Sequence, residues 1–265
     1  MTNAKTADSD ILFEVRDGMG LITLNRPEAR NALTFSMYER LAEICVGIEP
    51  AGEVKALVMT GAGGKAFAAG TDISLFRDFT TAEQALAYER RMDEVLTAIE
   101  TCPVPTIAAI AGACIGGGAA IAASCDLRIG ARDLKFGFPI ARTLGNCLSN
   151  ASLSRLVALI GQARTKEMVF TARLIEAEEA LSLGLVSELH ADHAAVLGRA
   201  LELARMLLGH APLTLRATKI ALRRMRLTTS GGSDEDLITM CYTSEDFREG
   251  LEAFLAKRPP RWKGR

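Results

Sequence analysis

The chain has 265 residues, of which 49% are hydrophobic, and its formal net charge is −1. This length and composition suit one sizeable α/β core, with or without an appended helical part. The near balance of charge argues against a nucleic-acid partner, and no apolar stretch approaches the ~18 residues of a membrane span. A basic cluster at Arg223, Arg224 and Arg226 is interpreted as a solvated helix face rather than a nucleic-acid contact.

The cysteines and the N-terminus indicate the compartment. The six cysteines have no paired spacing and mostly lie in apolar runs, so we expect reduced, buried thiols. Reduced cysteines are typical of a reducing compartment. Residues 1–10 are polar and lack the apolar segment of a signal peptide. We therefore expect a cytoplasmic protein.

The first elements are predicted from alternation and from helix-start signals. Residues 11–16 and 20–24 flank a glycine-bearing turn, which predicts a β-hairpin. Ser36 and Glu39 have the spacing of a capping box and predict the start of a helix. The apolar face of that helix would carry Met37, Leu41, Ile44 and Ile48.

Two buried strands are each followed by a glycine turn. Residues 54–60 are mostly apolar and β-branched, as expected for a strand covered on both faces, and the turn at 61–64 follows them. Residues 106–110 form a second such strand, and three glycines stand at 116–118. A helix is predicted between the two units, over residues 82–100.

The rest of the chain alternates short strands and helices and then becomes helical. Strands are predicted at 126–130, 134–136 and 185–189, and helices at 152–159, 163–170 and 176–183, with 139–150 irregular. From residue 193 onward the pattern is helical, with Pro212 opening one helix and Gly231 and Gly232 separating two others. The alternation of strand and helix indicates an α/β fold with buried strands.

Residues 61–66 fit the G-x-G-x-x-G/A pattern of dinucleotide-binding folds, which is weak evidence by itself. A dinucleotide site needs a helix that starts inside the motif and an acidic residue at the end of the next strand, and the next strand ends in Ala111 and Gly112. A phosphate loop is also disfavoured, because Lys65 is followed by Ala66 instead of Ser or Thr.

The two glycine turns are more informative together. A glycine after a strand lets the backbone turn tightly or lets a ligand approach closely. A helix that follows directs its free N–H groups and positive dipole end at that ligand. Two such turns, each after a buried strand, are the parts of an oxyanion hole.

The chain resembles the enoyl-CoA hydratase/isomerase family, also called the crotonase superfamily. The matching pieces are LNRPEARNAL at 24–33, KAFAAGTDI at 65–73, AAIAG at 108–112, GGG at 116–118, CD at 125–126, FGFP at 136–139, Ala180, GLV at 184–186 and SEDFREG at 244–250. They run in order through nearly the whole chain, across about residues 11–258.

The resemblance implies a fold and an assembly. We expect a crotonase-like (ClpP/crotonase) α/β spiral of ββα units, with a helical C-terminal oligomerisation region. On this basis residues 1–192 would form the core with the acyl-CoA site, and residues 193–265 a trimerisation region. The expected assembly is a homotrimer or a dimer of trimers.

The resemblance also implies an acyl-CoA substrate and assigns residues to it. The backbone N–H groups of Thr71 and Gly117 would hold the thioester oxygen, where the charge of an enolate gathers. Each donor of this kind is worth roughly 3 kcal/mol. Coenzyme A enters as part of the substrate, and neither a metal nor a redox cofactor is required. The substrate-binding residues expected from the match are Arg30, Ala68, Gly70, Asp72, Ile73, Ile140 and Arg142.

The chain departs from the hydratases of this family at both catalytic glutamates. One of those glutamates lies two residues after the glycine triplet, where this chain has Ala120. The other follows the proline of the FGxP segment, where this chain has Ile140. Neither side chain can give or take a proton, so water addition by the usual pair is not expected.

Several residues could replace the missing carboxylates. Cys147 and Asn146 fall where some relatives place a nucleophilic aspartate, and Cys147 is better explained as a buried small residue. Tyr88 and Glu89 lie on the helix after the first turn, where relatives recruit catalytic groups, and the periodicity also suits Tyr88 to the core. Arg142 either faces the pocket or is an exposed cation. Asp72 is interpreted as fixing the loop, and the histidines at 190, 193 and 210 lie far along the chain from both turns.

The sequence therefore predicts an enzyme that binds an acyl-CoA thioester and stabilises its enolate. Isomerisation, thioester hydrolysis and decarboxylation by another residue stay open beside hydration. Decarboxylation suits a site without carboxylates, because the oxyanion hole does most of the work. A non-catalytic acyl-CoA-binding subunit is the alternative from another class.

Overall fold

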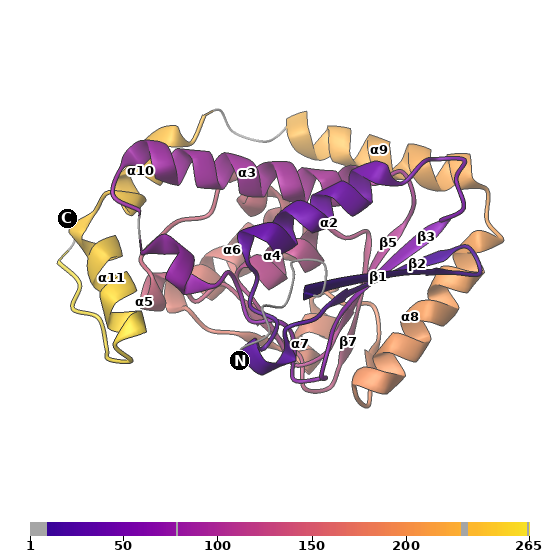
Figure 1. Ribbon diagram of the computed structural model, residues 1–265, viewed down its shortest axis with the longest axis horizontal. Coiled ribbons are helices and arrows are strands. Elements are labelled where there is room, and N and C mark those ends of the chain that lie inside the picture. The colour runs from indigo at the N-terminus through magenta and orange to yellow at the C-terminus, as the bar shows by residue number, and fades with distance from the viewer. Residues whose placement is uncertain (1–9, 78, 229–232, 264) are drawn as a thin grey trace, which may run out of the picture.

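The computed structural model describes residues 10–77, 79–228, 233–263 and 265 (Figure 1). Its larger sheet has six strands in the order β1-β2-β3-β5-β7-β10. These are β1 (Ile11–Arg16), β2 (Met19–Leu24), β3 (Ala56–Gly61), β5 (Thr106–Ile110), β7 (Leu127–Ala131) and β10 (Leu189–His190). Only β1 and β2 pair antiparallel, as the predicted hairpin, and the other neighbours are parallel.

A smaller sheet has four strands in the order β4-β6-β8-β9. These are β4 (Ala66–Ala68), β6 (Ala113–Ile115), β8 (Lys135–Gly137) and β9 (Ile175–Glu176). The chain passes three times from the larger sheet to the smaller one, as β3 to β4, β5 to β6 and β7 to β8, and each time continues into a helix. This repeated strand–strand–helix path is the spiral that the sequence match implied.

Helices cover both faces of the larger sheet. On one face lie α2 (Phe35–Gly47), α3 (Ala82–Thr101) and α4 (Gly117–Ser124), which enclose the main core. The other face is covered by α8 (His193–Leu208), seen beside the strands in Figure 1. Val196, Ala200 and Leu203 of α8 pack there against Val58 and Ile107. The first helix of the predicted C-terminal region is thus part of the core by its packing.

The remaining helices follow the core in sequence. They are η1 (Pro27–Ala29), η2 (Ile73–Phe76), α5 (Ile140–Thr143), α6 (Asn150–Thr171), α7 (Ala177–Ser182), α9 (Pro212–Thr228), α10 (Glu235–Tyr242) and α11 (Glu245–Leu255). None of the helices in the described part of the chain is long and apolar enough to cross a membrane. In that part α10 and α11 lie at one end of the long helix α3, and α9 lies at the other end (Figure 1).

The structure corrects four local predictions. Thr34, not Ser36, caps α2, because the Thr34 hydroxyl accepts from the Met37 amide. The two helices expected at 152–159 and 163–170 are one element with a kink at Gly161, where φ is 75°. The segment expected to be irregular contains α5, and the strand expected at 185–189 is reduced to β10. The separator at Gly231 and Gly232 lies outside the described residues.

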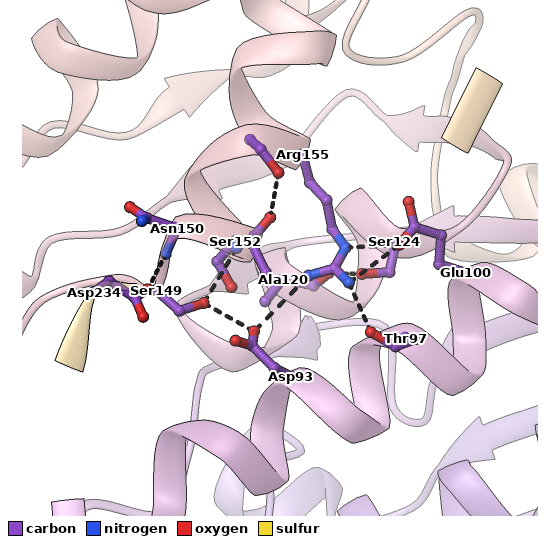
Figure 2. Close-up of polar contacts among 12 residues, drawn as sticks. Asp93, Thr97, Glu100, Ala120, Ser124, Ser149, Asn150, Ser152, Arg155 and Asp234 are labelled. Carbon is purple, nitrogen blue, oxygen red and sulfur yellow. Dashed lines mark hydrogen bonds and ion pairs between the residues drawn. The ribbon is translucent and has the colours of Figure 1, made fainter. Parts of the chain in front are cut away.

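A buried ion-pair network ties α6 to α3 behind the site (Figure 2). Arg155 of α6 is 4% exposed and donates to Glu100 at 3.1 Å and to Thr97 at 3.2 Å. Ser149, the N-cap of α6, donates to Asp93 of α3 at 2.8 Å. These contacts fix the spacing of two helices that both contribute residues to the pocket described next.

Candidate active site

A buried asparagine holds the first glycine turn in place. Asn31 is fully buried, and its side-chain amide donates to the carbonyl of Ala62 at 3.0 Å and to that of Ala66 at 2.8 Å. Its side-chain oxygen accepts from the amide of Arg26 at 3.0 Å. One side chain thereby joins the loop after β2 to both ends of the turn between β3 and β4.

The segment that carries Thr71 is then laid beside Leu33. The Leu33 amide donates to the carbonyl of Gly70 at 2.8 Å, and the Asp72 amide donates to the carbonyl of Leu33 at 2.9 Å. Gly70 has a φ of 116°, which side chains with a Cβ rarely adopt. The N–H of Thr71, between these two bonds, has no hydrogen-bond partner among the described residues.

The second glycine turn brings α4 against β4. Gly116 has a φ of 52° and donates to the carbonyl of Gly137 at 2.9 Å. A Cβ at Gly118 would clash with the carbonyl oxygen of Ala68, so only glycine permits this approach. Gly117 is the first residue of α4, and its N–H has no partner among the described residues. It therefore adds the positive end of a helix to the free amide.

The segment after β4 that carries Thr71 and the second glycine turn both border one pocket of about 470 Å³. Its wall includes the predicted residues Gly70, Thr71, Asp72, Ile73, Tyr88, Glu89, Gly117, Ile140 and Cys147. Ala120 lines it as well, so neither hydratase position carries a carboxylate there. Arg30 and Arg142 are exposed and Ala68 is buried, and none of these three predicted residues lines the pocket.

Three hydroxyl groups meet beside the two free amides. The Tyr38 oxygen lies 2.8 Å from the Thr71 hydroxyl, which lies 3.2 Å from the Tyr88 oxygen. Burial raises the pKa of both tyrosines, so both stay protonated. Sequence reasoning missed Tyr38, because the apolar face assigned to α2 was Met37 and its partners. The available signal was that Tyr38 directly follows Met37 in a helix that is covered on more than one side, so both residues can be buried.

Glu89 is the buried carboxyl group of this pocket, whose wall also includes the more exposed Asp72. Glu89 is 8% exposed and accepts a hydrogen bond from the Tyr242 hydroxyl of α10. Burial raises the pKa of Glu89 to about 7, with smaller contributions from the charges of Asp93 and Asp234, although the bond from Tyr242 acts in the opposite direction. Asn146 donates to the Tyr242 oxygen at 3.2 Å. A carboxyl with this pKa can both accept and return a proton near neutral pH.

The other predicted residues have different surroundings. A hydrogen bond with Cys241, together with burial, raises the pKa of the Cys147 thiol, which opposes the thiolate that a nucleophile needs. Asp72 caps η2 by accepting from the Ser74 amide at 3.2 Å and lies 3.6 Å from the Arg26 guanidinium. Its predicted part in fixing the loop agrees with these contacts.

The pocket wall also draws on the C-terminal helices of the same chain. Phe254 of α11 lines the pocket, and Tyr242 of α10 contacts Glu89. The rings of Phe76 and Tyr88 pack edge to face at 5.0 Å and join this wall to the loop that carries Thr71. The described residues contain no group of three or more His, Cys, Asp or Glu side chains placed to hold a metal ion.

Comparison with known proteins gives the family. The model of the enoyl-CoA hydratase/isomerase family matches residues 14–265. The short-chain-enoyl-CoA hydratase of Clostridium acetobutylicum is 32% identical, over 94% of this chain and 96% of that protein.

Solved structures agree with this match over almost the whole chain. The enoyl-CoA hydratase/carnithine racemase of Magnetospirillum magneticum has 33% identity and a TM-score of 0.77, covering 97% of this chain and 96% of that one. A methylmalonyl-CoA decarboxylase, solved with 2-nitronate-propionyl-CoA, has 26% identity and a TM-score of 0.87, covering 96% and 98%. With its strand–strand–helix spiral and these matches, the chain is a member of the enoyl-CoA hydratase/isomerase family.

Proposed function

We propose that this protein moves a proton on an acyl-CoA thioester through an enolate, with Glu89 as the acid–base group. The observation that carries the proposal is the position of Glu89, a buried carboxyl with a pKa of about 7, in the wall of the pocket that Thr71 and Gly117 border. The N–H groups of Thr71 and Gly117 are the donors to the thioester oxygen in this proposal. Their lack of any other partner among the described residues supports it.

The reaction that suits one carboxyl is a shift of a double bond from C3 to C2 of the acyl group. The Glu89 carboxylate takes a proton from C2, and the negative charge spreads to the thioester oxygen in the hole. The protonated Glu89 then gives the proton to C4, which leaves the 2-enoyl thioester and the carboxylate. No atom enters or leaves, so no second catalytic carboxyl is needed.

Hydration is the less suited reaction, because the positions of the two usual glutamates are Ala120 and Ile140 and both face the pocket. Decarboxylation is the second candidate. The close backbone similarity to a methylmalonyl-CoA decarboxylase favours it. Decarboxylation also depends mainly on the oxyanion hole and needs no catalytic carboxylate. A binding subunit without catalysis is the remaining alternative.

The assembly and the location belong to the proposal too. We infer a homotrimer or dimer of trimers in the cytoplasm, with an acyl-CoA ester as the ligand. In the described part of the chain α9 has no buried residue, and Leu213, Leu222 and Met225 of this helix are well exposed. An apolar surface of this kind supports an interface between copies.

The test uses the purified protein with 3-enoyl-CoA, 2-enoyl-CoA and malonyl-type thioesters as substrates. We expect conversion of 3-enoyl-CoA to 2-enoyl-CoA, and a loss of at least about 100-fold in Glu89→Gln, since general acid–base catalysis contributes 10²–10⁴-fold. Glu94→Gln is the matched control, because Glu94 lies on the same helix and is exposed. Decarboxylation that Glu89→Gln retains would favour the second candidate. Tight binding without turnover of any of these esters would favour the binding subunit.

A further inference from the structure

Three hydroxyl groups in a row at the pocket have one more proton than the hydrogen bonds between them use. Tyr38, Thr71 and Tyr88 carry three O–H groups, and two contacts, at 2.8 Å and 3.2 Å, join them. Each contact uses one proton, and in the described part of the chain these three oxygens have no further hydrogen-bond partner. One O–H therefore points elsewhere, whichever direction the chain of bonds takes.

Tyr38, at one end of this row of three hydrogen-bonded hydroxyl groups, lies against the second glycine turn. A Cβ at Gly117 would clash with the Tyr38 hydroxyl oxygen and would lie 3.1 Å from the Thr71 hydroxyl oxygen. The Tyr38 hydroxyl thus lies beside Gly117 and is bonded to the side chain of Thr71. These are the two residues whose free amides border the pocket. Tyr38 is 2% exposed, so a free donor here has no bulk water to satisfy it.

We propose that the Tyr38 hydroxyl is a third donor to the thioester oxygen, oriented by Thr71 and Tyr88. In this arrangement Tyr88 donates to the Thr71 hydroxyl, Thr71 donates to the Tyr38 oxygen, and the Tyr38 proton points at the ligand. The inference rests on the proposed acyl-CoA site and adds a side chain to its two backbone donors. No proton leaves Tyr38, because its role is to hydrogen-bond the oxyanion.

Burial and charge keep Tyr38 in the form that donates. Desolvation raises its pKa above the usual value, and the negative charge of Glu89 acts in the same direction, whereas the bond with Thr71 opposes them. A neutral phenol in a buried site is a good donor to a developing oxyanion, because it adds no net charge to the resting pocket.

The first test is a comparison of two ligands by calorimetry. A 2-nitronate acyl-CoA mimics the charged enolate oxygen, and the saturated acyl-CoA of the same length mimics the ground state. Tyr38→Phe should weaken nitronate binding by about 10-fold or more and change acyl-CoA binding less than about 3-fold, as expected for a donor that serves the charged state. Equal effects on both ligands, or none on either, would overturn the inference.

Variants of the other two hydroxyls locate the donor. Thr71→Val should weaken nitronate binding as Tyr38→Phe does, since Tyr38 loses its orientation, and Thr71→Ser should restore it. Tyr88→Phe should have the smallest effect, because Thr71 can still donate to Tyr38. A large loss in Tyr88→Phe together with none in Tyr38→Phe would place the donor at Tyr88 instead and contradict the proposal.

Kinetics separate this inference from the proposed reaction. If the protein turns over 3-enoyl-CoA, Tyr38→Phe should lower kcat with little change in KM, and its melting temperature should stay near that of the wild type. If Glu89→Gln leaves turnover intact, the acid–base assignment fails while the ligand comparison still tests Tyr38. If Glu89→Gln abolishes turnover and Tyr38→Phe alters neither kcat nor nitronate affinity, only the third donor is refuted.

Discussion

The Tyr242 hydroxyl donates a hydrogen bond to the Glu89 carboxylate, which joins α10 to α3 across 153 positions of sequence. This bond stabilises the charged form of Glu89, whereas burial and the charges of Asp93 and Asp234 favour the protonated form. Tyr242 is thus a positioning residue whose loss should be seen in the titration of Glu89.

Removal of this hydroxyl should move the pH profile. In the proposed reaction the Glu89 carboxylate is the base, so kcat/KM of the wild type should fall as the pH drops through about 7. In Tyr242→Phe the bond that lowers the Glu89 pKa is gone, so the acidic limb should move to higher pH, by roughly half to one unit. The pH dependence of kcat/KM, measured for both proteins, checks this. An acidic limb that stays in place would show that Tyr242 acts on packing alone.

Glu89 should also make the protein less stable as the pH rises. Its pKa is raised in the folded state, so the folded protein binds the proton more tightly than the unfolded chain does. The contribution of this proton is present in full below the unfolded pKa and is lost as the pH rises through about 7.

Glu89→Gln removes this charge while its amide oxygen can still accept from Tyr242. The variant should gain about 3 kcal/mol over the wild type in the free energy of unfolding between pH 4 and pH 8. Urea unfolding at the two pH values measures the difference, with Glu94→Gln as the exposed control on α3. A difference that does not depend on pH would contradict the buried, protonated state of Glu89.

The glycine at position 117 should be needed for catalysis but not for folding. A Cβ there would clash with the Tyr38 hydroxyl oxygen, so Gly117→Ala should displace one half of the hole. We expect a loss of about 100-fold in kcat. Gly198→Ala on α8 is the control, because nothing lies within 4 Å of its Cβ and alanine favours a helix. Gly117→Ala with wild-type kcat would contradict the assigned donor.

The network behind the pocket should matter for stability. Arg155→Leu removes the bonds of Arg155 to Glu100 and Thr97, whereas Glu100 keeps its ion pair with Arg226 of α9 and Asp93 keeps its bond from Ser149. We therefore expect a loss of about 2 kcal/mol in the free energy of unfolding. Arg164→Leu removes an exposed ion pair with Glu167 on the same helix and should change stability by less than about 0.5 kcal/mol. Thermal or urea unfolding of both variants measures the contrast, and equal losses would refute the structural role of Arg155.

The fold was largely predictable because its strands and turns have local signals. The strand over Thr106–Ile110 was predicted at its observed bounds, since a short apolar run ends where the glycines begin. Where two signals compete within three residues, prediction failed. Thr34 and Ser36 can both cap a helix, and the contact of Thr34 with the Met37 amide decides between them only once the chain is folded.

The lining of the candidate pocket was predictable where it depends on backbone and less so where it depends on tertiary contacts. Glycine turns mark Thr71 and Gly117 because the chain can take those conformations almost only with glycine. By contrast, Tyr242 reaches Glu89 from a distant helix, and no spacing in the sequence indicates that pair. The pKa of Glu89 depends on its burial. The apolar periodicity of the helix indicated burial for the neighbouring Tyr88 but not for Glu89.

Solvent exchange tests the central claim most directly. In deuterated buffer, the wild-type protein should exchange the C2 protons of a 3-enoyl-CoA ester and form the 2-enoyl ester, followed by proton NMR. Glu89→Gln should exchange at least about 100-fold more slowly, while Glu94→Gln should match the wild type. If the wild type neither exchanges nor converts the ester, or if Glu89→Gln does both at the wild-type rate, an enolate formed by Glu89 at the hole of Thr71 and Gly117 is contradicted.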